Sequence, residues 1–131
     1  PPTRETTAMK IAIAITSDPQ AGDDALGRAF QGLALAAEAR QHGDDVEIVF
    51  VGPGTRWPAL ASKLGHPLHG LFDAVRPAVK GASCACADVF GAATGVEACG
   101  VPKLKDFALA GTSGLASLRS YLAQGWQTLV F

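Results

Sequence analysis

Short apolar segments alternate with longer amphipathic ones along the whole chain. In the first apolar segment, Ile11, Ile13 and Ile15 alternate with small alanines, and Val46–Val51 is rich in β-branched residues. A strand that is apolar on both faces is typical of a parallel sheet covered by helices. We expect strands at residues 10–16, 46–51, 81–86, 101–104 and 126–131.

Between these strands, apolar residues recur at helical spacing. We expect Asp23 or Asp24 to cap the first helix, Gly43 to end it, and Ser113 to cap the last helix. The first helix carries an apolar stripe made of Leu26, Ala29, Phe30, Leu33 and Ala37. The helices are expected at residues 25–41, 57–64, 67–80, 88–98 and 115–124.

The alternation of strand and helix predicts one α/β domain. The length of 131 residues suits a single domain. We expect a mostly parallel sheet of about five strands with helices on both faces, spanning residues 9–131. Residues 1–8 are polar and contain two prolines, so they are expected to form an N-terminal tail.

Composition narrows the classes of function. The net charge of -1 argues against a nucleic-acid partner, which usually requires a basic excess. No apolar run approaches the roughly 18 residues that span a bilayer, so we expect no membrane partner. Residues 1–8 lack the features of a secretory signal, which favours a cytoplasmic location. No Gly-x-Gly-x-x-Gly motif follows the first strand and the histidines lack ligand spacing, so no cofactor or metal is expected.

The most informative residues are the cysteines. Three cysteines cannot all pair within one chain, which favours thiols in a reducing compartment. Cys84 and Cys86 lie where the third strand meets a helix, and both side chains share one face if the strand continues through them. The start of that helix favours a thiolate at Cys86, although the Asp88 carboxylate opposes it. Cys99 follows the helix and is expected at the opposite edge of the sheet.

These cysteines also have a plain structural interpretation. Cysteine is among the most buried residue types and often packs as a small hydrophobic residue. The residue pattern leaves both alternatives open for Cys84 and Cys86.

Several segments resemble the DsrE/DsrF-like family of small sulfur-relay and sulfur-oxidation proteins. The more specific ones are Cys86–Gly91 (Cys-Ala-Asp-Val-Phe-Gly) and the terminal Gly125–Phe131 (Gly-Trp-Gln-Thr-Leu-Val-Phe). The resemblance implies a Rossmann-like three-layer fold, assembly as a trimer or hexamer, and a persulfide on Cys86. Some resembling chains separate two cysteines here by two residues, whereas one residue separates Cys84 from Cys86. Many also carry His-Pro-Ser where this chain has Gly-Thr-Ser at residues 111–113.

We therefore expect a sulfur carrier or sulfurtransferase-like protein with Cys86 as the main candidate catalytic residue and its neighbour Cys84 as the second. Its partners would be a sulfur donor protein, an acceptor protein and other copies of the chain. The alternative is a non-catalytic oligomeric assembly or small-ligand-binding module in which the cysteines are structural.

Overall fold

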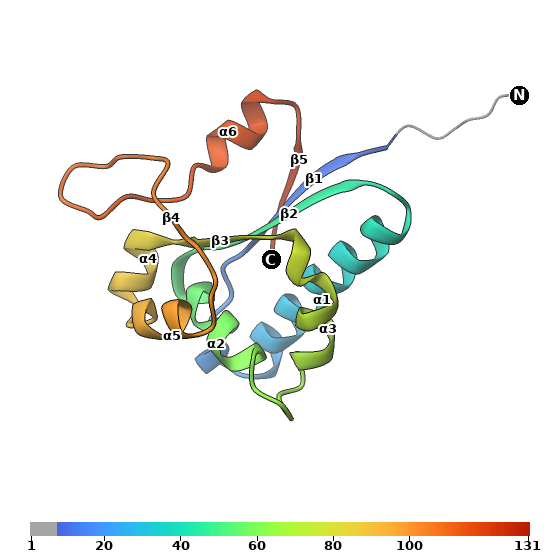
Figure 1. The fold of residues 1–131 in the computed structure, drawn as a ribbon, viewed down its shortest axis with the longest axis horizontal. Helices are drawn as coiled ribbons and strands as arrows, with labels where there is room; N and C mark the ends of the chain where they lie inside the picture. The colour runs from blue at the N-terminus through green and yellow to red at the C-terminus, as the bar shows by residue number, and fades with distance from the viewer. Residues whose placement is uncertain (1–7) are drawn as a thin grey trace, which may run out of the picture.

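The computed structural model describes residues 8–131, so the tail predicted at residues 1–8 lies outside the described residues except for Ala8. In this part of the chain, five strands form one sheet in the order β4-β3-β2-β1-β5 (Figure 1). Every neighbouring pair is parallel, so the predicted α/β class and parallel sheet are confirmed. The strands are β1 (Lys10–Ile15), β2 (Asp45–Phe50), β3 (Val79–Ser83), β4 (Lys103–Leu104) and β5 (Gln127–Val130).

The helices cover the two faces of the sheet unequally. Helices α1 to α5 lie on one face, and α6 lies on the other (Figure 1). The chain adds β1 to β4 in one direction and then returns to place β5 beside β1. Because parallel crossovers are right-handed, this reversal moves the connecting helix to the opposite face. The helices are α1 (Asp23–Gln41), α2 (Trp57–Ala61), α3 (His69–Val75), α4 (Cys84–Val89), α5 (Ala93–Ala98) and α6 (Leu118–Ala123).

Three short 3₁₀ helices complete the described part of the chain: η1 (Pro19–Ala21), η2 (Gly52–Arg56) and η3 (Arg76–Ala78). A helix was predicted over residues 67–80, but α3 ends at Val75. Pro77 lies in the 3₁₀ helix η3 that follows, and a proline cannot continue an α-helix. No helix within residues 8–131 is long and apolar enough to cross a membrane.

Strand β1, between β2 and β5, is buried on both of its faces. Its isoleucines belong to the larger core, which lies under α1 to α5. Its alanines, Ala12 and Ala14, belong to a smaller core with Val49 and Tyr121, which lies under α6. The largest side chains buried in the larger core include Phe50, Phe72, Leu33, Ile48 and Leu68.

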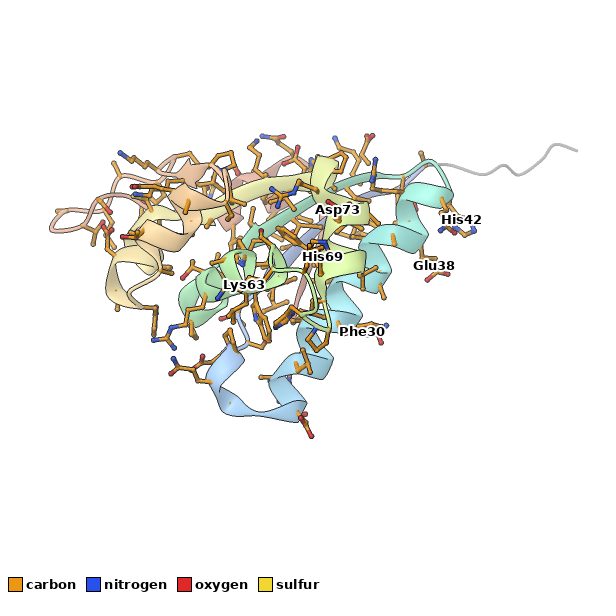
Figure 2. The ribbon with its side chains drawn as sticks, turned by 60° about the horizontal axis from the view of Figure 1, so that its bottom comes forward. Phe30, Glu38, His42, Lys63, His69 and Asp73 are labelled. Atoms are coloured by element: carbon orange, nitrogen blue, oxygen red, sulfur yellow. The ribbon has the colours of Figure 1, made fainter. Side chains whose placement is uncertain are left out.

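The side of α1 that packs on the sheet consists mostly of small residues, and this corrects the predicted stripe. Phe30 is 50% exposed and lies on the outer side of α1 with Glu38 and His42 (Figure 2). At Gly32, an added Cβ would lie 3.2 Å from the ring of Phe131, closer than an ordinary contact, so the ring would have to move to accept a side chain there. The buried residues of α1 are Ala25, Ala29, Gly32, Leu33, Ala36 and Ala39.

The ends of α1 agree with the prediction only in part. Gly43, at a φ of 82°, follows the helix end as expected. The predicted carboxylate cap is wrong, because Gly22 is the N-cap and makes no side-chain cap bond. Asp23 and Asp24 lie within the first turn, where their charges suit the positive end of the helix dipole.

The last helix, α6, begins later than predicted. Leu115 forms an antiparallel bridge with Phe107 instead of joining the helix. Residues 105–117 therefore form a loop that projects from the sheet (Figure 1), and we call it the 105–117 loop. The helix starts at Leu118, and its cap is Ser117 rather than Ser113, with the Ser117 hydroxyl accepting a backbone N–H.

A buried tyrosine fastens α6 to the sheet. Tyr121 Oη donates a hydrogen bond to Glu47 Oε1 at 2.6 Å, and Lys80 Nζ lies 3.7 Å from the same oxygen. The Tyr121 ring packs edge-on against Trp126, with the ring centroids 5.2 Å apart. Burial raises the pKa of Tyr121 above its ordinary value, and the hydrogen bond to Glu47 and the charges of Glu47 and Asp106 raise it further.

The backbone of η2 lies directly against the end of β1. A Cβ added at Gly54 would lie 2.1 Å from the Ile15 carbonyl oxygen. The neighbouring Thr55 is fully buried, and its hydroxyl donates to the Gly52 carbonyl at 2.8 Å. This contact holds the connection after β2 against the end of β1, at the carboxyl edge of the sheet.

Gly54→Ala should destabilise the protein by about 3 kcal/mol, because the new methyl group forces η2 away from β1. The matched control is Gly27→Ala, since Gly27 lies within α1 with nothing within 4 Å of an added Cβ. That control should gain about 0.5–1 kcal/mol from higher helix propensity. Urea denaturation measures both, and equal stability of the two variants would contradict the close contact.

Tyr121 should ionise well above the usual pH for a tyrosine, because the folded protein disfavours its phenolate. The chain has a single tyrosine, so the phenolate absorbance reports this residue alone. Glu47→Gln should lower the midpoint, yet leave it above the usual value, because burial is the larger cause. Circular dichroism during the titration would confirm that the fold persists. An ordinary midpoint in the folded wild type would refute the buried hydrogen bond.

Candidate functional site

The two neighbouring cysteines lie on a helix, and not on a strand as predicted. Strand β3 ends at Ser83, and α4 begins directly at Cys84. Side chains two positions apart on a helix point to different sides, so the predicted pair on one face is wrong. Cys84 is buried, with 4% of its surface exposed, whereas Cys86 is partly exposed. Alanines alternate with both cysteines, and alanine has the highest helix propensity, which favours an early start of the helix.

The chain bends after α4, where one helix was expected over residues 88–98. Helix α4 ends at Val89 and α5 begins at Ala93. Between them Gly91 has a φ of 67°, a conformation that an α-helix cannot continue through. The Phe90 N–H closes the last turn by donating to the Cys86 carbonyl at 3.0 Å. Cys86 and Phe90 therefore lie on one side of α4, one turn apart.

The 105–117 loop is fastened to the start of α4. The Ala85 N–H donates to the Gly114 carbonyl at 2.8 Å, and the Ser83 hydroxyl accepts a backbone N–H from the loop at 3.0 Å. At the next turn, Ser113 Oγ donates to Asp88 Oδ2 at 2.6 Å. The Asp88 carboxylate, expected to oppose a thiolate at Cys86, is thus held by a hydroxyl group of this loop.

A lysine lies beside the buried cysteine. Lys103 pairs with Ala82 across β3 and β4, and its side chain, 23% exposed, forms an ion pair with Glu97. The hydrogen bond to Glu97 raises the pKa of Lys103. Partial desolvation opposes this rise, and the charges of Glu97, Cys84 and Asp88 add to it. Lys103 lies within the strand expected at residues 101–104, but the sequence does not indicate its neighbours, because Glu97 belongs to α5 and Cys84 to α4.

A second residue that the sequence did not single out is Arg56. Its Nε donates to the Phe90 carbonyl at 3.0 Å, and its Nη1 donates to Asp18 Oδ1 at 3.0 Å. The guanidinium also lies 5.5 Å from the centre of the Phe90 ring. Arg56 therefore connects the segments that follow β1, β2 and β3. Its position directly after a turn at the end of a strand was the available signal.

The histidines and Cys99 lie apart from this arrangement. Each histidine engages its Nδ1 with the backbone: His42 with Glu38, His66 with Leu68, and His69 with Ala61. Cys99 follows α5, and its Sγ donates to a carbonyl of that helix at 3.4 Å. Among the residues that the structure describes, no group of three histidine, cysteine or acidic side chains is placed to hold a metal ion.

No family model, curated protein or solved structure matches the chain. The resemblance to the DsrE/DsrF-like family therefore stays a prediction based on the motifs at residues 86–91 and 125–131. The features that bear on function are therefore the cysteines of α4 and the side chains around this helix.

Proposed function

We propose that this protein is a sulfur carrier that holds sulfane sulfur as a persulfide on Cys86. The observation that carries the proposal is the contrast between two thiols at the carboxyl edge of the sheet. Cys84 is buried in the first turn of α4, whereas Cys86 is partly exposed. In open parallel sheets this edge is where ligands bind. Access to the sulfur is the first requirement for thiol exchange, so Cys86 is the candidate nucleophile and Cys84 its structural neighbour.

The transfer is an exchange between thiolates and needs no oxidant or reductant. Cys86 releases its proton to solvent, and its thiolate attacks the terminal sulfur of a donor persulfide. A new S–S bond joins Cys86 Sγ to that sulfur, the S–S bond of the donor breaks, and the donor leaves as a thiolate. The proton of the terminal sulfur stays on it. In the second transfer, the thiolate of an acceptor protein attacks the same sulfur, and Cys86 leaves as a thiolate.

The proposed carrier requires a reducing compartment. All three are free thiols in the structure. A partly exposed thiol stays reduced where glutathione and thioredoxin act, so the carrier that we propose would work in the cytoplasm.

Cys86→Ser should abolish persulfide loading. The wild-type protein, incubated with glutathione persulfide, should gain one sulfur atom by intact-mass spectrometry, and peptide mapping should place it on Cys86. Cys84→Ser and Cys99→Ser are matched controls and should still load, because the attacking sulfur is retained. If the wild type gains no sulfur, the carrier is excluded and the non-catalytic alternative is favoured. Equal loading of Cys86→Ser would exclude Cys86 as the residue that holds the sulfur.

We also propose that the chain forms a homo-oligomer, the trimer or hexamer implied by the family resemblance. Strand β5 pairs with β1 on one side and is the last strand of the sheet on the other. It carries no charged residue, and Leu129 and Val130 are 42% and 62% exposed. An apolar sheet edge of this kind is suited to contact with another copy of the chain.

Val130→Lys should lower the assembly mass, because a charge on the exposed edge opposes burial against a second copy. Sedimentation equilibrium measures the mass directly. The matched control is Leu64→Lys, since Leu64 is 87% exposed and lies after α2, away from β5. A wild-type protein that sediments as a monomer would exclude the oligomer.

A further inference from the structure

A pocket of about 330 Å³ opens where the connections after β1, β2 and β3 meet. Its walls come from η1, from η2 and α2, and from the turn between α4 and α5. Most of the lining is apolar, including Leu60 and the ring of Phe90. Its volume lies at the lower end of the range for small-molecule sites, which begins at about 300 Å³. Its position at the carboxyl edge of a parallel sheet is where such sites occur.

Arg56 is the one charged residue among those that line this pocket. Its side chain is 27% exposed and is held from one side by the hydrogen bond of Nε to the Phe90 carbonyl. Nη1 meets Asp18, and Nη2 has no hydrogen-bond partner among residues 8–131. The guanidinium is therefore fixed in position and keeps free donor capacity.

Asp18 uses only part of the hydrogen-bond donor capacity of the Arg56 guanidinium. A single oxygen, Oδ1, accepts from Arg56 at 3.0 Å and from the Gln20 N–H at 2.9 Å. The Gln20 bond, and then Arg56, lower the pKa of Asp18, so its carboxylate is ionised at neutral pH. A guanidinium fork can hold a carboxylate with two parallel hydrogen bonds, which this single contact does not achieve.

The charges around the pocket favour a singly charged ligand. Asp18 already neutralises part of the Arg56 charge, and Asp23 and Asp24 follow in the first turn of α1. A phosphate, with nearly two negative charges at neutral pH, would meet this acidic segment. A monocarboxylate adds one charge, and an apolar body would match the Leu60 and Phe90 walls.

We propose that this pocket binds a small organic monocarboxylate, with the carboxylate on Arg56 and the apolar part against Leu60 and Phe90. The site does not depend on sulfur chemistry at Cys86. The bound ligand would nevertheless lie beside Phe90, which is one helical turn from Cys86.

Benzoate and benzamide are suitable probes, because they share an apolar ring and differ in charge. In a ¹H–¹⁵N NMR titration of the full chain, benzoate should shift the amide signals of Gly91 and Gly95 saturably. Benzamide should bind about tenfold more weakly or not at all, since it lacks the charge-assisted hydrogen bonds. Equal binding of the two probes, or no saturable shift with benzoate, would overturn the proposal.

Three variants test the role of the arginine. Asp18→Asn removes the competing carboxylate and keeps an oxygen for the Gln20 N–H, so benzoate should bind more tightly. Arg56→Gln should weaken benzoate about tenfold or more. Arg28→Gln is the matched control, because Arg28 pairs with Asp24 at 2.7 Å on the exposed side of α1 and binding should not change.

The sign of the Asp18→Asn effect separates this site from non-specific anion binding. Weaker or unchanged binding in a folded Asp18→Asn would overturn the proposal, as would full affinity in a folded Arg56→Gln. If Arg56→Gln does not fold, the benzamide comparison and Asp18→Asn still decide the question.

Discussion

The packing of β1 against the small residues of α1 is the contact on which the rest of the structure depends. The isoleucine side of β1 meets a helix surface made mostly of alanine and glycine, so α1 lies close to the sheet. That closeness also brings Gly32 against the Phe131 ring, at the end of β5. The opposite side of β1 carries alanines, which form the smaller core with Tyr121 of α6. Both cores and two neighbouring strands therefore share β1, and its carboxyl end fixes the edge at which the loops converge.

The strands were predictable from the sequence because their signal is local and strong. Three isoleucines in β1 and the β-branched residues of β2 have few alternatives to a buried strand. The predictions failed where small residues dominate. Cys84–Ala87 has neither β-branched residues nor a helical stripe, so local preference did not locate the end of β3. Phe30 has the spacing of a core residue, but α1 faces the sheet with its alanine-rich side, a tertiary choice that leaves Phe30 half exposed.

The candidate site, like the fold, was predictable from the sequence only in part. Cys86 could be chosen as a candidate from the sequence, because a cysteine near the end of an expected strand is visible without a fold. The surroundings of α4 could not, since they depend on distant parts of the chain. Arg56 is 38 residues from Asp18 and 34 from Phe90, and Ser113 is 25 residues from Asp88. Such pairs form only when parallel strands bring their carboxyl ends together, so spacing along the sequence carries no record of them.

The thiol and the pocket share one short helix, and this has a thermodynamic consequence. Cys86 and Phe90 lie on one side of α4, and the Phe90 carbonyl holds Arg56 in the pocket. If a sulfur atom on Cys86 changes the affinity of the pocket for a carboxylate, a bound carboxylate must change the stability of the persulfide by the same factor. The 105–117 loop also holds α4, through the Ala85–Gly114 hydrogen bond in its first turn and the Ser113–Asp88 hydrogen bond near its end. A displacement of α4 would disturb both the Arg56 contacts and the loop contacts, so this helix is a direct physical connection between the two sites.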